Sequence, residues 1–247
     1  MKKLFALLAN VATVAATVAA TTAAHAQTPV GTAPVPQGPT SAQAPVGSGP
    51  APAASPRAAD KLVAMCIGCH NIPGYQASFP EVHKVPMIAG QSAKYIVSAL
   101  QAYKKGERKH PTMRGISASL SEQEMNDIGL YYEQLTKGKT SPVPDAAPQP
   151  PADVQALLAK GNCIACHGAN FNKAIDPSYP KLAGQHADYL YVALKSYQAE
   201  NNLYVGRNNA IMAAQVKPFS QAELKKLAKY IGSLPGEMQT PPQPRFR

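Results

Sequence analysis

All four cysteines of the chain belong to two copies of one short motif, Cys-x-x-Cys-His. The motif residues are Cys66, Cys69 and His70 in the first copy and Cys163, Cys166 and His167 in the second. Two thiols three positions apart lie on one side of a short turn, so both can add to the vinyl groups of one porphyrin. The following histidine then lies beneath the iron. The sequence therefore predicts two covalently bound haem c groups, with the motif histidines as iron ligands.

Three other kinds of site use paired cysteines. A zinc site would need a second pair of ligands near each motif, and the chain has no further cysteine. Disulfides or a thioredoxin-like redox pair remain as alternatives, but both leave the two histidines at identical offsets unexplained. We therefore favour haem.

A haem iron also needs a sixth ligand or an open position, and this choice separates an electron carrier from an enzyme or gas-binding protein. Met113 and Met212 lie 43 and 45 residues beyond the motif histidines and are the methionine pair that matches between the two halves. A thioether sulfur favours ferrous iron and raises the reduction potential. We expect both methionines to be axial ligands, and His110 is the competing candidate in the first half.

Each motif histidine needs an acceptor that fixes its second ring nitrogen. The carbonyl groups of Pro86 and Pro180, which precede two Ala-Gly-Gln turns, are candidate acceptors. His83 and His186 have no histidine counterpart in the other half, so we expect them to be exposed or to lie in loops, and we keep them as secondary alternatives for an iron ligand.

The chain around the two motifs is an internal repeat. Superimposing Cys66 on Cys163 aligns two Pro-x-(Ile/Leu)-Ala-Gly-Gln turns and then two segments with matching tyrosines. Further on, Ser121 to Glu124 and Ser220 to Glu223 are both Ser-x-x-Glu capping boxes that precede helical apolar spacing. The pattern in each half therefore predicts a short helix that leads into the motif, a middle helix after Ala-Gly-Gln and a closing amphipathic helix.

The closing helices carry small residues, Gly129 and Ala228, at equivalent positions. A small side chain there would allow another helix to cross closely. No alternating apolar pattern typical of strands appears, so we expect an all-α fold.

The first 26 residues have the three parts of a secretory signal peptide. Lys2 and Lys3 precede an apolar run from Leu4 to Ala20, and Ala24-His25-Ala26 is a small-x-small cleavage site. We expect cleavage and a periplasmic location, with a retained membrane anchor as the alternative.

Proline-rich segments divide the remainder of the chain. We expect a signal peptide (1–26), a Pro/Ala-rich disordered leader (27–57), a first haem-binding domain (58–140), a Pro-rich linker (141–151), a second haem-binding domain (152–236) and a tail (237–247). A haem would supply much of the core that such small domains lack.

The region from about residue 58 to 234 resembles the cytochrome c4 family of di-haem c-type cytochromes. The resemblance rests on the paired motifs, the Ala-Gly-Gln turns, the tyrosine helix and a methionine before each closing capping box. It implies two tandem class I cytochrome c domains, pseudo-twofold related, each wrapped around one covalently attached haem. The chain departs from its own repeat at Asn71, where the second motif has Gly168, and in the longer loop of residues 71–85.

The resemblance implies a periplasmic electron carrier of a respiratory chain, passing electrons toward a terminal oxidase without substrate chemistry of its own. A dedicated cytochrome subunit of a dehydrogenase or oxidase complex is the alternative, and a di-haem enzyme such as a peroxidase is a more distant one. A persistent complex on purification would favour the subunit.

The formal net charge of +10, or +8 without Lys2 and Lys3, predicts redox partners with acidic docking surfaces. We expect these partners to be a terminal oxidase and an upstream reductase or dehydrogenase, and we leave peripheral membrane attachment open. Nucleic acid is not expected, because the chain lacks a nucleic-acid motif. The candidate docking residues are Lys104, Lys105, Arg108 and Lys109 in the first half and Lys225, Lys226 and Lys229 in the second.

Overall fold

The computed structural model of the protein describes residues 61–242. The expected signal peptide (1–26), the whole expected leader (27–57) and the last five residues of the expected tail (243–247) therefore lie outside the described residues. Within residues 61–242, no helix has the length and apolar character needed to cross a membrane.

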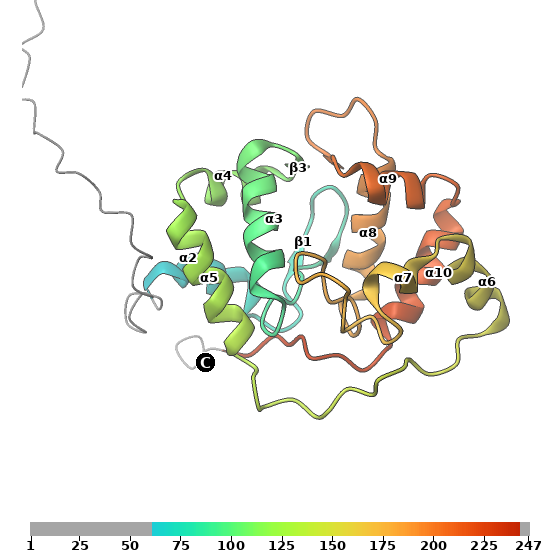
Figure 1. The fold of residues 1–247 in the computed structure, drawn as a ribbon. Coiled ribbons are helices and arrows are strands. Elements are labelled where there is room, and N and C mark those ends of the chain that lie inside the picture. The colour runs from blue at the N-terminus through green and yellow to red at the C-terminus, as the bar shows by residue number, and fades with distance from the viewer. Residues whose placement is uncertain (1–60, 243–247) are drawn as a thin grey trace, which may run out of the picture. The chain divides into compact units, whose positions relative to one another are not determined.

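Two similar sets of helices make up this part of the chain (Figure 1). The first set is α2 (Ala64–His70), α3 (Ala93–Lys105), α4 (Pro111–Ala118) and α5 (Glu122–Gln134). The second set is α6 (Ala152–Lys160), α7 (Cys163–His167), α8 (Ala187–Gln198), α9 (Ala210–Val216) and α10 (Gln221–Gly232). Four two-residue strands, β1 (Gln76–Ala77), β2 (His83–Lys84), β3 (Arg108–Lys109) and β4 (Gly206–Arg207), form two small sheets.

The three helices expected in each half are confirmed, whereas α4, α9, the separate helix α6 ahead of the motif helix α7 and the strands were not expected. Both closing helices begin at the predicted capping boxes. The Ser121 hydroxyl accepts from the Glu124 backbone N–H, and the Glu124 carboxylate accepts from the Ser121 N–H at 2.8 Å. Strands of two residues are too short for any alternating pattern, so the sequence carried no signal for them.

Each half packs its middle helix against its closing helix, α3 on α5 and α8 on α10. The first core includes Val63, Ile67, Ile96, Leu100, Met125, Ile128 and Tyr132, and the second includes Leu157, Leu158, Phe171, Leu190, Leu224, Leu227 and Ile231. The close crossing predicted at Gly129 is confirmed, because a Cβ atom there would lie 2.8 Å from the Ala93 carbonyl oxygen.

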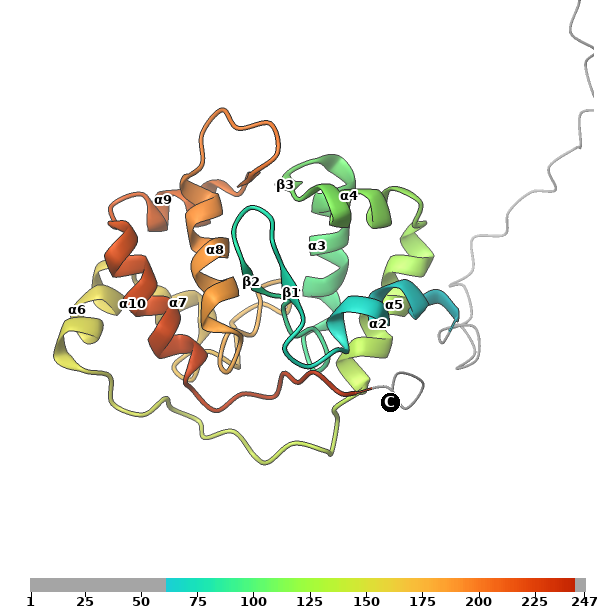
Figure 2. The ribbon, with the colours of Figure 1, turned by 180° about the vertical axis from the view of Figure 1, so that it is seen from behind.

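The longer loop of the first half packs against the second half. Its strands β1 and β2 form a hairpin beside α8 (Figure 2). The Lys84 N–H donates to the Asp188 carboxylate at 3.0 Å, and Lys195 pairs with Glu81 at 2.9 Å. The departure from the repeat therefore adds contacts between the halves.

The segment after α10 runs back along the first half to the end of α5 (Figure 1). The Gln239 N–H donates to the Ala89 carbonyl at 3.0 Å. Asn71 donates to the Pro241 carbonyl at 3.0 Å and accepts from the Tyr132 hydroxyl at 3.2 Å. Asn71 thus attaches this C-terminal segment to α5, a role that glycine could not perform.

We predict that Gly129→Ala destabilises the haem-loaded protein by about 1–3 kcal/mol, because the added methyl group meets the α3 backbone. Gly115→Ala on α4 is the matched control, since a Cβ atom there meets nothing within 4 Å. The control should gain about 0.5–1 kcal/mol from helix propensity. Denaturant unfolding measures both changes, and equal effects would contradict the close crossing.

Candidate functional site

Both Cys-x-x-Cys-His motifs lie on short helices that end at their histidine. Cys66, Cys69 and His70 are on α2, and the second motif forms the whole of α7. No disulfide joins any of the four cysteines, all of which lie within residues 61–242. Residues 61–242 contain no cluster of three or more His, Cys, Asp or Glu side chains arranged to hold a metal ion, as a zinc site would require.

The predicted acceptors hold both motif histidines. His70 Nδ1 lies 2.8 Å from the Pro86 carbonyl oxygen, and His167 Nδ1 lies 3.4 Å from that of Pro180. Burial lowers the pKa of both imidazoles, which favours the neutral ring. Each ring therefore donates from Nδ1 and keeps the lone pair of Nε2 for another group.

Met113 and Met212 lie in the first turns of α4 and α9. The His110 ring nitrogen Nδ1 accepts from the Met113 N–H at 3.4 Å, and the Asn209 side chain accepts from the Met212 N–H at 2.9 Å. His110 and Asn209 are therefore equivalent N-caps, which fix the start of each methionine helix. This local role accounts for a histidine three residues before Met113.

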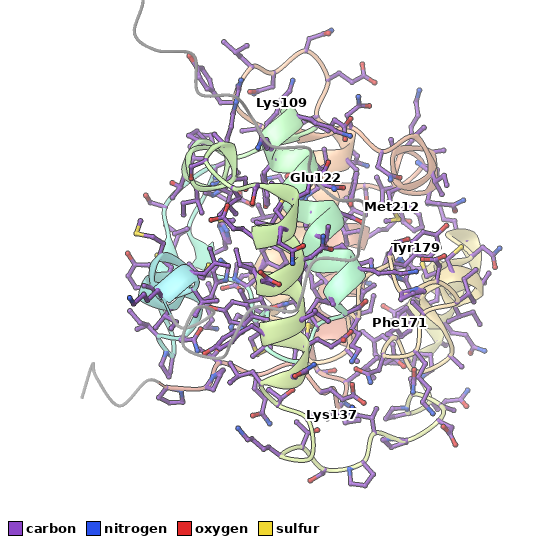
Figure 3. The ribbon with its side chains drawn as sticks, turned by 60° about the vertical axis from the view of Figure 1, so that its left-hand side comes forward. Lys109, Glu122, Lys137, Phe171, Tyr179 and Met212 are labelled. Carbon is purple, nitrogen blue, oxygen red and sulfur yellow. The ribbon has the colours of Figure 1, made fainter. Side chains whose placement is uncertain are left out.

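One continuous cavity of about 740 Å³ extends through both halves. Both motifs and both methionines line it, and apolar surface predominates on its wall. In the second half, Tyr179 also lines the cavity, with its ring centroid 6.4 Å from that of His167; Figure 3 labels Tyr179 and Met212. The sequence-predicted site residues are thus brought together around one space.

Two arginines and four tyrosines from the two halves form a cluster on the cavity wall. The cluster consists of Arg108, Arg207, Tyr95, Tyr103, Tyr189 and Tyr197. Strands β3 and β4 pair Arg108 directly with Arg207. The Tyr189 hydroxyl accepts from Arg108 at 3.3 Å and from Arg207 at 3.0 Å. Residues of both halves therefore build this cluster.

Known proteins with similar sequences and structures are c-type cytochromes, as the paired motifs and the shared cavity would lead one to expect. The cytochrome c family model matches residues 151–235. Cytochrome c4 of Azotobacter vinelandii is 28% identical over 201 residues, covering 74% of this chain and 90% of that protein. The crystal structure of reduced cytochrome c4 from Pseudomonas stutzeri is 27% identical with a TM-score of 0.51, covering 72% of this chain and 97% of the other. The chain is a cytochrome c4-like di-haem protein.

A second kind of relative is the thiosulfate dehydrogenase electron acceptor of Thiomonas intermedia (strain K12). It is 26% identical over 193 residues, covering 74% of this chain and 84% of the relative. The cytochrome c4-like protein thus has the predicted class I cytochrome c fold, carries two covalent haem c groups and transfers electrons.

The charge of the cavity wall suits haem, which is a largely apolar ring with two carboxylates. None of the ion pairs within residues 61–242 includes Arg108 or Arg207. The buried Nε of Arg108 has no hydrogen-bond partner there. Burial alone would raise the pKa of Tyr189, but the two guanidinium groups outweigh it and lower this pKa to about 8. The wall therefore offers donors and positive charge to an anion.

One sequence-based expectation about this cytochrome c4-like protein is wrong. Arg108 is directed into the cavity wall rather than exposed with its lysine neighbours, because β3 pairs with β4. His83 lies in the loop of residues 71–85, as one of the two expected alternatives, but it is only 4% exposed, and its ring lies 6.1 Å from that of Tyr189. Neither the inward position of Arg108 nor the burial of His83 can be inferred from local sequence, since both depend on contacts between segments about 100 residues apart.

We predict that His110→Asn leaves the axial ligands of both haems unchanged, because asparagine supplies the same cap that Asn209 gives in the second half. The ferric protein should keep its charge-transfer band for methionine-ligated haem, with the same intensity per haem. His110→Ala should cost about 1 kcal/mol of stability through the lost cap. A changed band in His110→Asn would identify His110 as a ligand instead.

Proposed function

We propose that this chain is a periplasmic electron carrier of a respiratory chain that passes electrons toward a terminal oxidase. The observation that carries the proposal is the single cavity lined by both motifs and both methionines. Two haems within one cavity can exchange electrons directly. Such electron transfer requires no catalytic side chain on the cavity wall. The export-type sequence of residues 1–26 supports the periplasmic location.

We propose one equivalent set of haem-binding residues in each half of the chain. The proposed attachment residues are Cys66, Cys69, Cys163 and Cys166, and the proposed iron ligands are His70, Met113, His167 and Met212. When bound, each haem supplies an iron that changes between the ferrous and ferric states. The chain's own residues would hold the histidine and methionine side chains of each half in place, so that electron transfer would change no bond.

We further propose that Arg108 and Arg207 hold haem carboxylates. Their guanidinium groups lie on the cavity wall and stack on tyrosine rings, at 4.7 Å from Tyr103 and 5.4 Å from Tyr197. Stacked guanidinium groups keep donors free at their edges, which suits carboxylates. Their positive charge also opposes the gain of positive charge on oxidation, which favours a high potential.

We predict that Met113→Ala or Met212→Ala lowers the potential of one haem and opens that iron to carbon monoxide after reduction. The fall should lie within the range of about 0.8 V over which axial ligands set haem potentials. Spectroelectrochemistry of the haem-loaded variants measures it. Met65→Ala is the matched control, because Met65 is 70% exposed and should leave both potentials unchanged. Wild-type potentials and spectra in both ligand variants would refute the assignment.

A second candidate is a cytochrome dedicated to one dehydrogenase. Relatives named thiosulfate dehydrogenase electron acceptors, at 26% and 28% identity, favour it. The two candidates differ in how the reduced protein is reoxidised and in how long the partner stays bound. A carrier forms short-lived complexes whose encounter rate depends on charge.

For a free carrier, we predict that membranes containing a terminal oxidase reoxidise the reduced protein at a rate that falls with ionic strength. Charge-neutral variants of Lys104, Lys105 and Lys109 together, compared with Lys225, Lys226 and Lys229, should identify the docking face by a several-fold loss of rate. All six lysines are exposed. Absence of reoxidation, with a stable complex to a dehydrogenase on purification, would favour the dedicated acceptor.

A further inference from the structure

The glutamines of the two Ala-Gly-Gln turns cross to the opposite half. Gln185 accepts from the Met87 N–H at 3.0 Å and donates to the Met87 carbonyl at 2.8 Å. Gln91 accepts from the Lys181 N–H at 2.9 Å and donates to the Lys181 carbonyl at 2.9 Å. Met87 and Lys181 are equivalent in the repeat. The exchange is therefore reciprocal.

The residue that each glutamine binds follows the proline that holds a haem histidine. The Met87 N–H and the Pro86 carbonyl belong to one peptide group, and that carbonyl lies 2.8 Å from His70 Nδ1. A peptide that donates through its N–H is polarised, so its oxygen becomes a better acceptor. The amide oxygen of Gln185 is thus linked to His70 through a single peptide group.

The same chain of contacts exists in the other direction. Gln91 accepts from the Lys181 N–H, whose peptide carbonyl, that of Pro180, lies 3.4 Å from His167 Nδ1. The second contact is longer than the 2.8 Å between Pro86 and His70. We therefore expect the link from Gln91 to be the weaker one.

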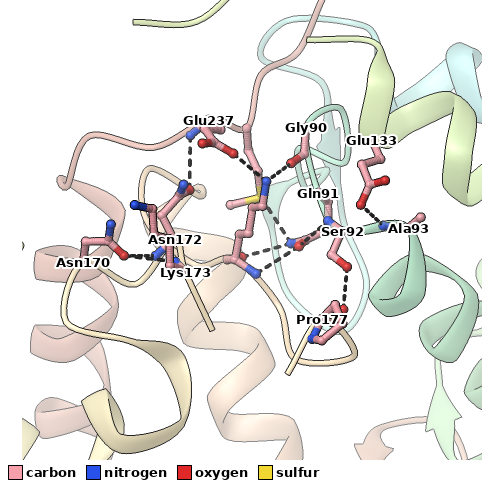
Figure 4. Close-up of polar contacts among 12 residues, drawn as sticks. Gly90, Gln91, Ser92, Ala93, Glu133, Asn170, Asn172, Lys173, Pro177 and Glu237 are labelled. Carbon is pink, nitrogen blue, oxygen red and sulfur yellow. Dashed lines mark hydrogen bonds and ion pairs between the residues drawn. The ribbon is translucent and has the colours of Figure 1, made fainter. Parts of the chain in front are cut away.

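Neighbouring groups fix the orientation of both amides. The nitrogens of Gln91 and Gln185 donate to the buried sulfur of Met238, at 3.3 and 3.6 Å. The Gln91 oxygen also accepts from the Ser92 N–H, as the Gln185 oxygen does from the His186 N–H. Figure 4 shows Gln91 within this network. Each amide therefore presents its oxygen, and not its nitrogen, to the peptide N–H.

We propose that Gln91 and Gln185 are positioning residues through which each half sets the basicity of the haem histidine in the other half. Gln185 acts on His70, and Gln91 acts on His167. The proposal rests on the proposed function, in which these histidines bind iron. A better acceptor at Nδ1 makes the histidine a stronger donor to iron, which favours the ferric state and lowers the potential.

The test uses the haem-loaded full chain and assigns a potential to each haem. Stepwise reduction followed by NMR of the haem methyl protons gives both potentials, with each haem assigned through its contacts to neighbouring residues. Gln185→Met keeps the side-chain length and removes the amide, so it should raise the potential of the haem on His70. Gln91→Met should raise the potential of the haem on His167 by a smaller amount.

Two further variants separate this effect from a general loosening between the halves. Gln185→Glu keeps an acceptor for the Met87 N–H in either protonation state, so it should not raise the potential. Ser92→Ala removes a neutral hydrogen bond across the halves, to the Pro177 carbonyl, without touching either linked peptide. It should leave both potentials unchanged.

The proposal is overturned if Gln185→Met leaves the potential of the haem on His70 unchanged or shifts the potentials of both haems equally. It is also overturned if Gln185→Glu or Ser92→Ala raises that potential as much as Gln185→Met does. A wild-type spectrum without histidine ligation would overturn the proposed function as well. Normal histidine–methionine spectra combined with any of the first results would overturn only the crossed effect of the glutamines.

Discussion

The fold depends on one constraint, namely that two small sets of helices must enclose large flat groups that the chain itself does not supply. Each half spans only roughly 70–80 residues from its first helix to its last. Such a length buries too little apolar surface to form a stable core easily. Both cores accordingly open onto the same cavity, with Leu100 and Ile128 on one side and Leu190 and Leu227 on the other. Covalent attachment of haem to cysteine makes this arrangement permanent.

The contact between the halves is polar and reciprocal, and it reaches the peptide groups whose carbonyls contact His70 and His167. Gln91 and Gln185 are 3% and 4% exposed, and both amides have their hydrogen bonds satisfied. Buried amides of this kind specify one geometry, because any sliding of one half would leave them unpaired. The C-terminal segment reinforces this geometry through Met238. A fixed relation between two haems is what electron transfer between them requires.

The contact between the two halves also determines where positive charge lies on the cavity wall, through Arg108 and Arg207. Two half-buried cations held side by side by β3 and β4 repel each other, and only tyrosine hydroxyl groups are bonded to their guanidinium groups within the described residues. Aromatic faces and hydroxyl oxygens reduce this cost, and anions on a bound group would reduce it further. The positive charge belongs to neither half alone, since Tyr189 accepts from both Arg108 and Arg207.

Local chemistry determined much of this protein. The spacing of Cys66, Cys69 and His70, the capping box at Ser121 and the apolar spacing after it act within a few residues, so the sequence alone predicted the haem motifs, the main helices and the Pro86 acceptor. The need for a small residue at Gly129 was also predictable, because the equivalent position of the second closing helix, Ala228, is small as well. Only the tertiary structure decided the inward position of Arg108, the burial of His83 and the partners of Gln91 and Gln185. Those features arise where the two halves meet, and each depends on residues about 100 positions apart, for which no local propensity exists.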